Sequence, residues 1–391
     1  MKTILLLVSI FIVSHAFDES QQLQIKYPLQ NEKNTQKLLH AMQENIQTYL
    51  YETPRSSYAY FDKKSSTLKS QALITWIHGE LYVNTLGSTE KPHVRVTLNN
   101  EQFAHLGDYR YDIFTLLSDL LLKMQEDSDF SGSKEKAILG TLVDGYFARL
   151  EDQKLQCPCI DEALSSTKQS DILVEYTKLQ GEARRFNTRM ETLKRVDSKH
   201  SKLMQEKMNA YLKDFDLLPV KDIAMDEYGD YLFLCEGKTK AVEDDIIFVL
   251  SARTLPVTYQ VNAKMKKAYL NTTLLKQEKV ISSFNKNQYV GHITIDGQNF
   301  YVNKLNPSLK LQPQSEKTRA YKNYASALGF TLASFHSNAN IKPCKDFKLK
   351  AISQVKQRLL KTELIAMVYA YNETLEERWE IFNNTELITR K

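Results

Sequence analysis

The stretch that decides the fold is Ile77-His78-Gly79-Glu80-Leu81-Tyr82-Val83-Asn84-Thr85-Leu86-Gly87, an apolar run framed by two glycines. Residues 72–77 lead into it and residues 94–98 follow it, and both segments have the short apolar pattern that is typical of strands. Glu80 is the only acidic side chain of the run. We therefore expect the segment to connect short strands and to hold one carboxylate between them.

Helical and antiparallel patterns follow one another along the rest of the chain. Helical patterns cover residues 34–50, 112–124, 133–150, 262–284, 315–337 and 345–382, and residues 161–215 are predicted to form one long, charged helix. Alternating patterns predict two hairpins, one from residues 231–236 and 245–252, the other from residues 289–295 and 299–305 around Asp296-Gly297. Helices combined with at least two antiparallel units predict an α+β fold that is rich in helix.

The first residues predict export. Lys2 precedes the apolar run of residues 4–13, and Ser14-His15-Ala16 has the small residues of a signal-peptidase site, so a signal peptide is expected to end at Ala16. No later segment contains the ~18 consecutive apolar residues that cross a bilayer. We expect a mature protein that is secreted or periplasmic and has no membrane span.

Composition sets the broad class of the protein. The 391 residues are 42% hydrophobic and 25% charged, as in a globular protein with a real core. The 52 basic and 47 acidic residues nearly balance, which does not favour nucleic-acid binding. After the signal peptide, we expect an N-terminal helical part over 17–217, a β-rich part over 218–310 and C-terminal helices over 311–391.

The cysteines are expected to be structural. Cys157, Cys159, Cys235 and Cys344 would lie in an oxidising compartment after export, and the sequence does not choose among their pairings. Because Cys157 and Cys159 are too close for an easy mutual disulfide, each is expected to reach a distant partner. One Cys-x-Cys without a nearby histidine is a poor metal site.

Five blocks of the chain, in order, carry a family resemblance. Residues 324–336, Tyr-Ala-Ser-Ala-Leu-Gly-Phe-Thr-Leu-Ala-Ser-Phe-His, resemble a family segment Tyr-Ala-x-x-x-Gly-x-Thr-Leu-Ala-x-x-His. The other blocks are residues 56–61, 79–87, 107–112 and 297–302. Their order and spacing resemble the uncharacterised bacterial family called domain of unknown function 2252, which is grouped with kinase-like proteins.

The resemblance implies a kinase-like fold of two lobes with a permuted order. The segment from Gly79 to Gly87 aligns with the family's Gly-Asp-x-His-x-x-Asn-x-Gly, so the catalytic-type segment precedes the β-rich lobe that would hold the nucleotide. Glu80 and His78 then fall at catalytic positions. Asn100, Ser251 and His336 fall at cofactor-binding positions, where a degenerate Mg-ATP site is the expectation and no metal ligand is assigned.

The departures from the family pattern predict impaired catalysis. Phosphoryl transfer needs a lysine on the phosphates, Mg²⁺ and a carboxylate that orients the nucleophile. Glu80 is one methylene longer than aspartate, a displacement of about 1 Å that can lower a rate about a hundredfold. Asn100 offers Mg²⁺ no charge, and Ser251 replaces the family's lysine. Asp226-Glu227 occupy the expected phosphate loop, where carboxylates repel an anion.

Three functions stay open at this point. The first is a catalytically impaired binding or scaffold protein for an unknown protein or small-molecule partner. The second is a noncanonical phosphotransferase that uses Glu80 with a relocated lysine such as Lys304. The third is a structural protein of the cell envelope, in which His78 and His336 are packed core residues. The sequence contains no Gly-x-Ser-x-Gly elbow and no His-Glu-x-x-His zinc helix, so it does not favour a hydrolase of either type.

Overall fold

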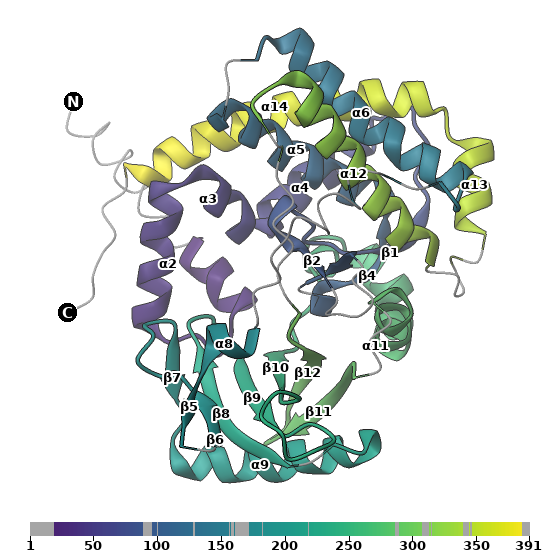
Figure 1. The fold of residues 1–391 in the computed structure, drawn as a ribbon. Coiled ribbons are helices and arrows are strands. Elements are labelled where there is room, and N and C mark those ends of the chain that lie inside the picture. The colour runs from purple at the N-terminus through teal and green to yellow at the C-terminus, as the bar shows by residue number, and fades with distance from the viewer. Residues whose placement is uncertain are drawn as a thin grey trace.

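The computed structural model describes residues 19–88, 96–99, 101–127, 130–155, 157, 160, 172–181, 183–217, 219–285, 289–306, 313, 315–338, 344 and 346–384. Helices gather on one side of the molecule and the largest sheet lies on the other (Figure 1). All paired strands in the described residues are antiparallel. The predicted α+β class is therefore confirmed. The expected signal peptide lies outside the described residues.

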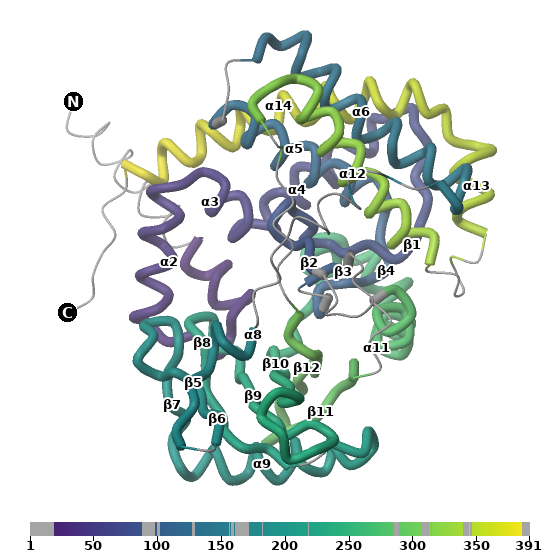
Figure 2. The backbone as a smooth tube through the Cα atoms, viewed as in Figure 1, coloured from purple at the N-terminus to yellow at the C-terminus, as the bar shows by residue number. Residues whose placement is uncertain are grey.

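The helical side is built around one core that joins early and late parts of the chain. Its helices are α2 (Glu32–Glu44), α3 (Ile46–Glu52), α4 (Pro54–Ser65), α5 (Tyr109–Asp127), α6 (Gly132–Glu151), α12 (Thr318–Asn338), α13 (Phe347–Gln354) and α14 (Gln357–Asn383). The C-terminal α14 runs along α5 and α6 (Figure 2). The division into three parts, expected at residues 217 and 310, stays a prediction. The C-terminal helices of the third part pack against helices of the first part.

Glycines set how closely α12 and α6 approach. A Cβ on Gly329 would lie 2.0 Å from the carbonyl oxygen of Leu142, and one on Gly145 would lie 2.9 Å from that of Ser326. Only hydrogen atoms fit at these two positions, so the backbones of the two helices come into direct contact. The resemblance block at residues 324–336 is therefore a packing surface of the helical core.

A six-stranded sheet forms the other side, in the order β11-β12-β10-β9-β8-β7. Its strands are β7 (Leu193–Arg195), β8 (Val220–Asp226), β9 (Tyr231–Cys235), β10 (Ile246–Ala252), β11 (Gly291–Ile295) and β12 (Gln298–Lys304). Helix α9 (Ser198–Leu212) covers one face, and its buried Met204 and Met208 pack with Phe233 and Phe248 of the sheet. Both predicted hairpins are confirmed, with β9 paired to β10 and β11 paired to β12.

Short elements join the two sides. Strand β1 (Ile74–Ile77) pairs with β4 (His105–Asp108), and β2 (Leu86–Ser88) pairs with β3 (Val96–Leu98), so the expected strands flank the glycine-framed segment. Further elements are the 3-10 turns η1 (Val83–Thr85), η2 (Glu101–Phe103) and η3 (Lys213–Phe215) and the helices α8 (Ile172–Tyr176), α10 (Val257–Val261) and α11 (Ala263–Asn285). No helix in the described part of the chain is both long and apolar enough to cross a membrane.

The single long helix predicted over residues 161–215 is wrong. Within that range the structure has α8, a ribbon of β5 (Thr177–Gln180) and β6 (Ala183–Phe186), strand β7 and only then α9. The side chain of Arg184 donates to the Val242 carbonyl and to Thr177, so tertiary contacts fix charged residues in a strand. Context of this kind outweighs the helical propensity of arginine and lysine.

Neither of the distant cysteines in the described residues, Cys235 or Cys344, is a disulfide partner of Cys157. Cys157 is disulfide-bonded, whereas Cys235 and Cys344 are buried free thiols. Cys235 belongs to the core of the sheet and Cys157 to the core of the helices, so these two cysteines lie in different parts of the molecule. Cys159 lies outside the described residues.

Candidate functional site

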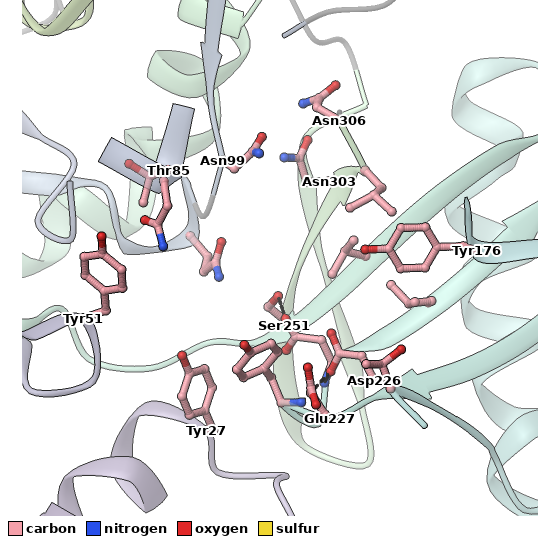
Figure 3. Close-up of a pocket in the computed structure, with 18 of the residues that line it drawn as sticks. Tyr27, Tyr51, Thr85, Asn99, Tyr176, Asp226, Glu227, Ser251, Asn303 and Asn306 are labelled. Carbon is pink, nitrogen blue, oxygen red and sulfur yellow. Dashed lines mark hydrogen bonds between the residues drawn. The ribbon is translucent and has the colours of Figure 1, made fainter. Parts of the chain in front are cut away.

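A cavity of about 1280 Å³ lies where the helical side meets the six-stranded sheet. The helical wall comes from α2, α3, the glycine-framed segment and η2, and the sheet wall comes from α8 and from strands β7, β8, β9, β10 and β12. In Figure 3, Thr85 and Asn99 lie on the side opposite Asp226 and Glu227. The cavity is thus formed by segments that are far apart in the sequence.

Glu80 reaches this cavity through a tight turn at Gly79. The φ of Gly79 is +83°, and a Cβ there would lie 2.4 Å from the ring of His105, so glycine is required. The turn places the Glu80 carboxylate in the cavity wall with the residue only 6% exposed. Burial raises the pKa of Glu80, although the charge of Lys26 opposes this shift.

Lys26 occupies the position beside Glu80. It ends a helix over residues 19–26, and its ammonium lies 3.0 Å from Glu80 and 3.2 Å from Glu52 while donating to the Tyr51 carbonyl at 2.7 Å. Burial by itself lowers the pKa of Lys26, but the two carboxylates outweigh burial and raise it above its ordinary value. The Lys26 ammonium therefore stays protonated across the physiological range.

Ser251 of β10 lines the sheet wall of the same cavity, and so do residues of the turn between β8 and β9. Its hydroxyl donates to the Asp230 carboxylate at 2.5 Å. Within the turn between β8 and β9, the Asp226 carboxylate accepts from the backbone N–H groups of Tyr228 and Asp230, both at 2.9 Å. Burial and then the charge of Asp230 raise the pKa of Asp226, and burial raises the pKa of Asp230 to about 6.

The two histidines of the predicted site lie elsewhere, in a buried network around Asp112. The carboxylate of Asp112 accepts from the backbone N–H groups of His78 and Gly79 at 2.7 and 2.9 Å, and His336 Nε2 lies 3.2 Å from it. His336 Nδ1 is bonded to the Tyr146 hydroxyl at 2.9 Å. Both histidines are at most 1% exposed, and burial lowers the pKa of His78. This network holds the glycine turn in place.

Asp112 lies in the first turn of α5, where the helix dipole favours a carboxylate. Although burial raises its pKa, the bond and charge of His336 and the donors from the glycine turn outweigh burial and lower it. Asp112 therefore fixes the turn before Glu80 from the first turn of α5.

The structure thus brings together some of the predicted positions. Glu80 and Ser251 line one cavity, and Asn99 lines it as well. The predicted Asn100 lies outside the described residues. Lys26 and Asp230 also belong to the site but were missed, because a lysine in Gln24-Ile25-Lys26-Tyr27 has no local pattern that separates it from a surface lysine.

Three features of this lining differ from what the binding of Mg-ATP for phosphoryl transfer requires. Glu80, the expected base, is paired with Lys26. Ser251 stands where the family resemblance places a lysine. The turn expected to receive phosphates contains Asp226 and Glu227. Among the described residues no group of three or more His, Cys, Asp or Glu side chains is arranged to hold a metal ion. Carboxylates in place of a cationic cradle oppose the binding of a polyphosphate.

The fold and the site define an α+β protein with a cavity between a helical side and an antiparallel sheet. Comparison with known protein families, with curated proteins and with solved structures gives no match to this chain.

Proposed function

We propose that this protein is an exported, catalytically impaired kinase-like protein that binds a small molecule in the cavity between its helices and its sheet. The observation that carries the proposal is that Glu80 and Ser251, which are far apart in the sequence, line one cavity. The family resemblance requires this juxtaposition, because it assigns the two positions to the catalytic and phosphate-binding parts of one site.

The proposed kinase-like arrangement has a permuted order. The helical side carries the glycine-framed segment, and the six-stranded sheet with its turn at Asp226 takes the place of the nucleotide lobe. The position of the cavity between the two sides supports this assignment, since ligand sites often lie between lobes.

We propose that phosphotransfer is lost because the site has carboxylates where positive charge is needed, and because its Glu80 and Ser251 side chains already have partners within the protein. Glu80 is paired with Lys26 and Ser251 donates to Asp230, so neither side chain is placed to serve an incoming phosphate. Phosphoryl transfer depends on positioning and on positive charge around the transferred group.

A thermal-shift titration with Mg-ATP, run together with an ATP turnover assay, tests this proposal. We expect no saturable rise in the melting temperature and no turnover. Saturable stabilisation accompanied by turnover would overturn the proposed impairment.

The alternative, a phosphotransferase that uses Glu80, is favoured by one observation: Lys304 at the end of β12 also lines the cavity. On that account Glu80→Gln and Lys304→Met would each abolish turnover while the protein stays folded. Turnover that persists in both variants would exclude it. A purely structural envelope role predicts neither turnover nor any ligand in the cavity.

A further inference from the structure

Carboxylates dominate the charged lining of the cavity. They are Glu52, Glu80, Glu175, Asp226, Glu227 and Asp230, and they come from both walls. The lining lysines in the described residues are Lys26 and Lys304. A partly enclosed space with such a lining has a negative potential, which concentrates cations and repels anions.

The chain itself shows what one wall binds. The Lys26 ammonium lies between Glu52 and Glu80, and it lies 5.3 Å from the ring centroid of Tyr27 and 5.8 Å from that of Phe103. Carboxylates beside aromatic faces are the usual surroundings of a bound organic ammonium group. This half of the lining is already neutralised from within the protein.

The opposite wall also combines carboxylates with tyrosine rings, and its lysine, Lys304, forms no ion pair with Asp226 or Asp230 in the described residues. Nor does any other lysine, arginine or histidine within the described residues form an ion pair with either carboxylate. The polar contacts of these carboxylates are backbone N–H groups and the Ser251 hydroxyl. Two half-buried carboxylates that face a cavity without a counterion are a place for a cation from outside.

Tyrosine rings complete the lining. They are Tyr27, Tyr51, Tyr82, Tyr176, Tyr228 and Tyr301. Tyr27 and Tyr176 lie on different sides of the cavity near Asp226 and Glu227 (Figure 3). The π-face of tyrosine attracts a cation, and its apolar body packs against the methylene groups of an alkyl amine.

We propose that the ligand of this cavity is an organic amine with two or more ammonium groups, one of them bound against Asp226 and Asp230. The inference rests on the proposed binding function and names the ligand class for that site. The volume of about 1280 Å³ exceeds what a single ammonium group fills, so an extended polyamine or an amino sugar fits better than a small monoamine.

Isothermal titration calorimetry of the mature full-length chain with spermidine at pH 7.5 and moderate salt tests the inference. We expect saturable binding that weakens about tenfold or more in the double variant Asp226→Asn/Asp230→Asn, because a desolvated charge loses its partners. Asp296→Asn is the matched control. It changes an exposed aspartate in the turn between β11 and β12 and should leave the affinity unchanged.

The other possible outcomes reject either the inferred ligand class or the proposed binding function. Absence of spermidine binding, or binding that the double variant retains, overturns the cationic ligand class. If instead ATP binds and Lys304→Met abolishes that binding, the cavity is a ligand site but the inferred class is wrong. If neither ligand binds, both the inference and the proposed binding function fail. Circular dichroism and thermal melts of each variant separate lost binding from lost folding.

Discussion

The Lys26 ammonium lies 3.0 Å from the Glu80 carboxylate, so a lysine from the first helix described neutralises the carboxylate at the predicted catalytic position. Both side chains are less than a tenth exposed, and Glu52 shares the same lysine at 3.2 Å. Such a buried pair makes stability sensitive to substitution, because removal of either partner leaves a buried charge without its counterion. Because the Glu80 carboxylate is held by Lys26, it is not free to accept a proton from a substrate as a catalytic base does.

Lys26→Met should lower the free energy of unfolding by about 3–5 kcal/mol at neutral pH, because Glu52 and Glu80 then remain buried without their cation. The deficit should shrink as the pH falls, since the raised pKa of Glu80 lets it take up a proton early. Urea denaturation measures both effects. Lys37→Met removes an exposed pair with Glu191 and should change stability by about 1 kcal/mol or less; equal effects of the two substitutions would contradict this account.

Asp119 provides a pH-dependent stability term. Burial raises its pKa to about 6, although it accepts from the Val83 N–H at 2.6 Å and the Tyr51 hydroxyl at 2.9 Å. Because the pKa of the folded state exceeds that of the unfolded chain, the stabilising contribution is full below about pH 4 and is lost as the pH rises through 6. The loss should be about 3 kcal/mol.

Denaturation of wild type and Asp119→Asn between pH 4 and 7 isolates this contribution. The difference in unfolding free energy should change with pH across that window and level off above it. Asp144→Asn removes an exposed ion pair with Lys361 and is the control for the loss of a surface carboxylate, which should change stability by about 1 kcal/mol or less. A flat difference for Asp119→Asn would show that this carboxyl has an ordinary pKa.

Gly229 should matter more than another turn glycine with the same backbone conformation. Its φ is +91°, and a Cβ would lie 2.7 Å from the Leu29 backbone, whereas Gly297 has φ +79° and open space around it. Gly297→Ala should destabilise by about 1–2 kcal/mol through backbone strain alone. Gly229→Ala should add about 1–3 kcal/mol from the clash. Thermal unfolding of both variants compares them, and similar losses would mean that residues 29–30 do not pack tightly on this turn.

Asp112→Asn tests whether the buried network holds the glycine turn. One carboxylate oxygen becomes a donor that faces a backbone N–H, so we expect a loss of about 2–4 kcal/mol and faster amide exchange at His78 and Gly79. Hydrogen exchange read at these two amides measures it directly. Unchanged protection of both amides would assign the stability of the turn to other contacts.

Local patterns predicted the parts of the fold that local interactions determine. The hairpin around Asp296-Gly297 and the helices α5 and α6 were found because turn chemistry and apolar periodicity act over a few residues. The ribbon of β5 and β6 was missed because its arginines are fixed by partners elsewhere in the chain, as the bond from Arg184 to Val242 shows. No short-range signal encodes such contacts.

The candidate site was predictable to a similar degree. Glu80 and Ser251 were singled out by the family resemblance, and the structure brings them to one cavity. The contribution of Lys26 was not predictable, because it depends on how the first helix packs against α3 and the glycine turn. The sequence pointed to Asp226 as a carboxylate that would repel a phosphate, but it did not point to Asp230. The role of Asp230 is visible only in the structure, where it accepts a hydrogen bond from Ser251.

On the proposals above, the cavity is a ligand site whose charge favours cations over phosphates. The most direct measurement is a paired calorimetric titration of the same wild-type protein with spermidine and with Mg-ATP under identical salt and pH. The account predicts saturable heat with spermidine and none with Mg-ATP. Saturable binding of Mg-ATP in the absence of spermidine binding would contradict it.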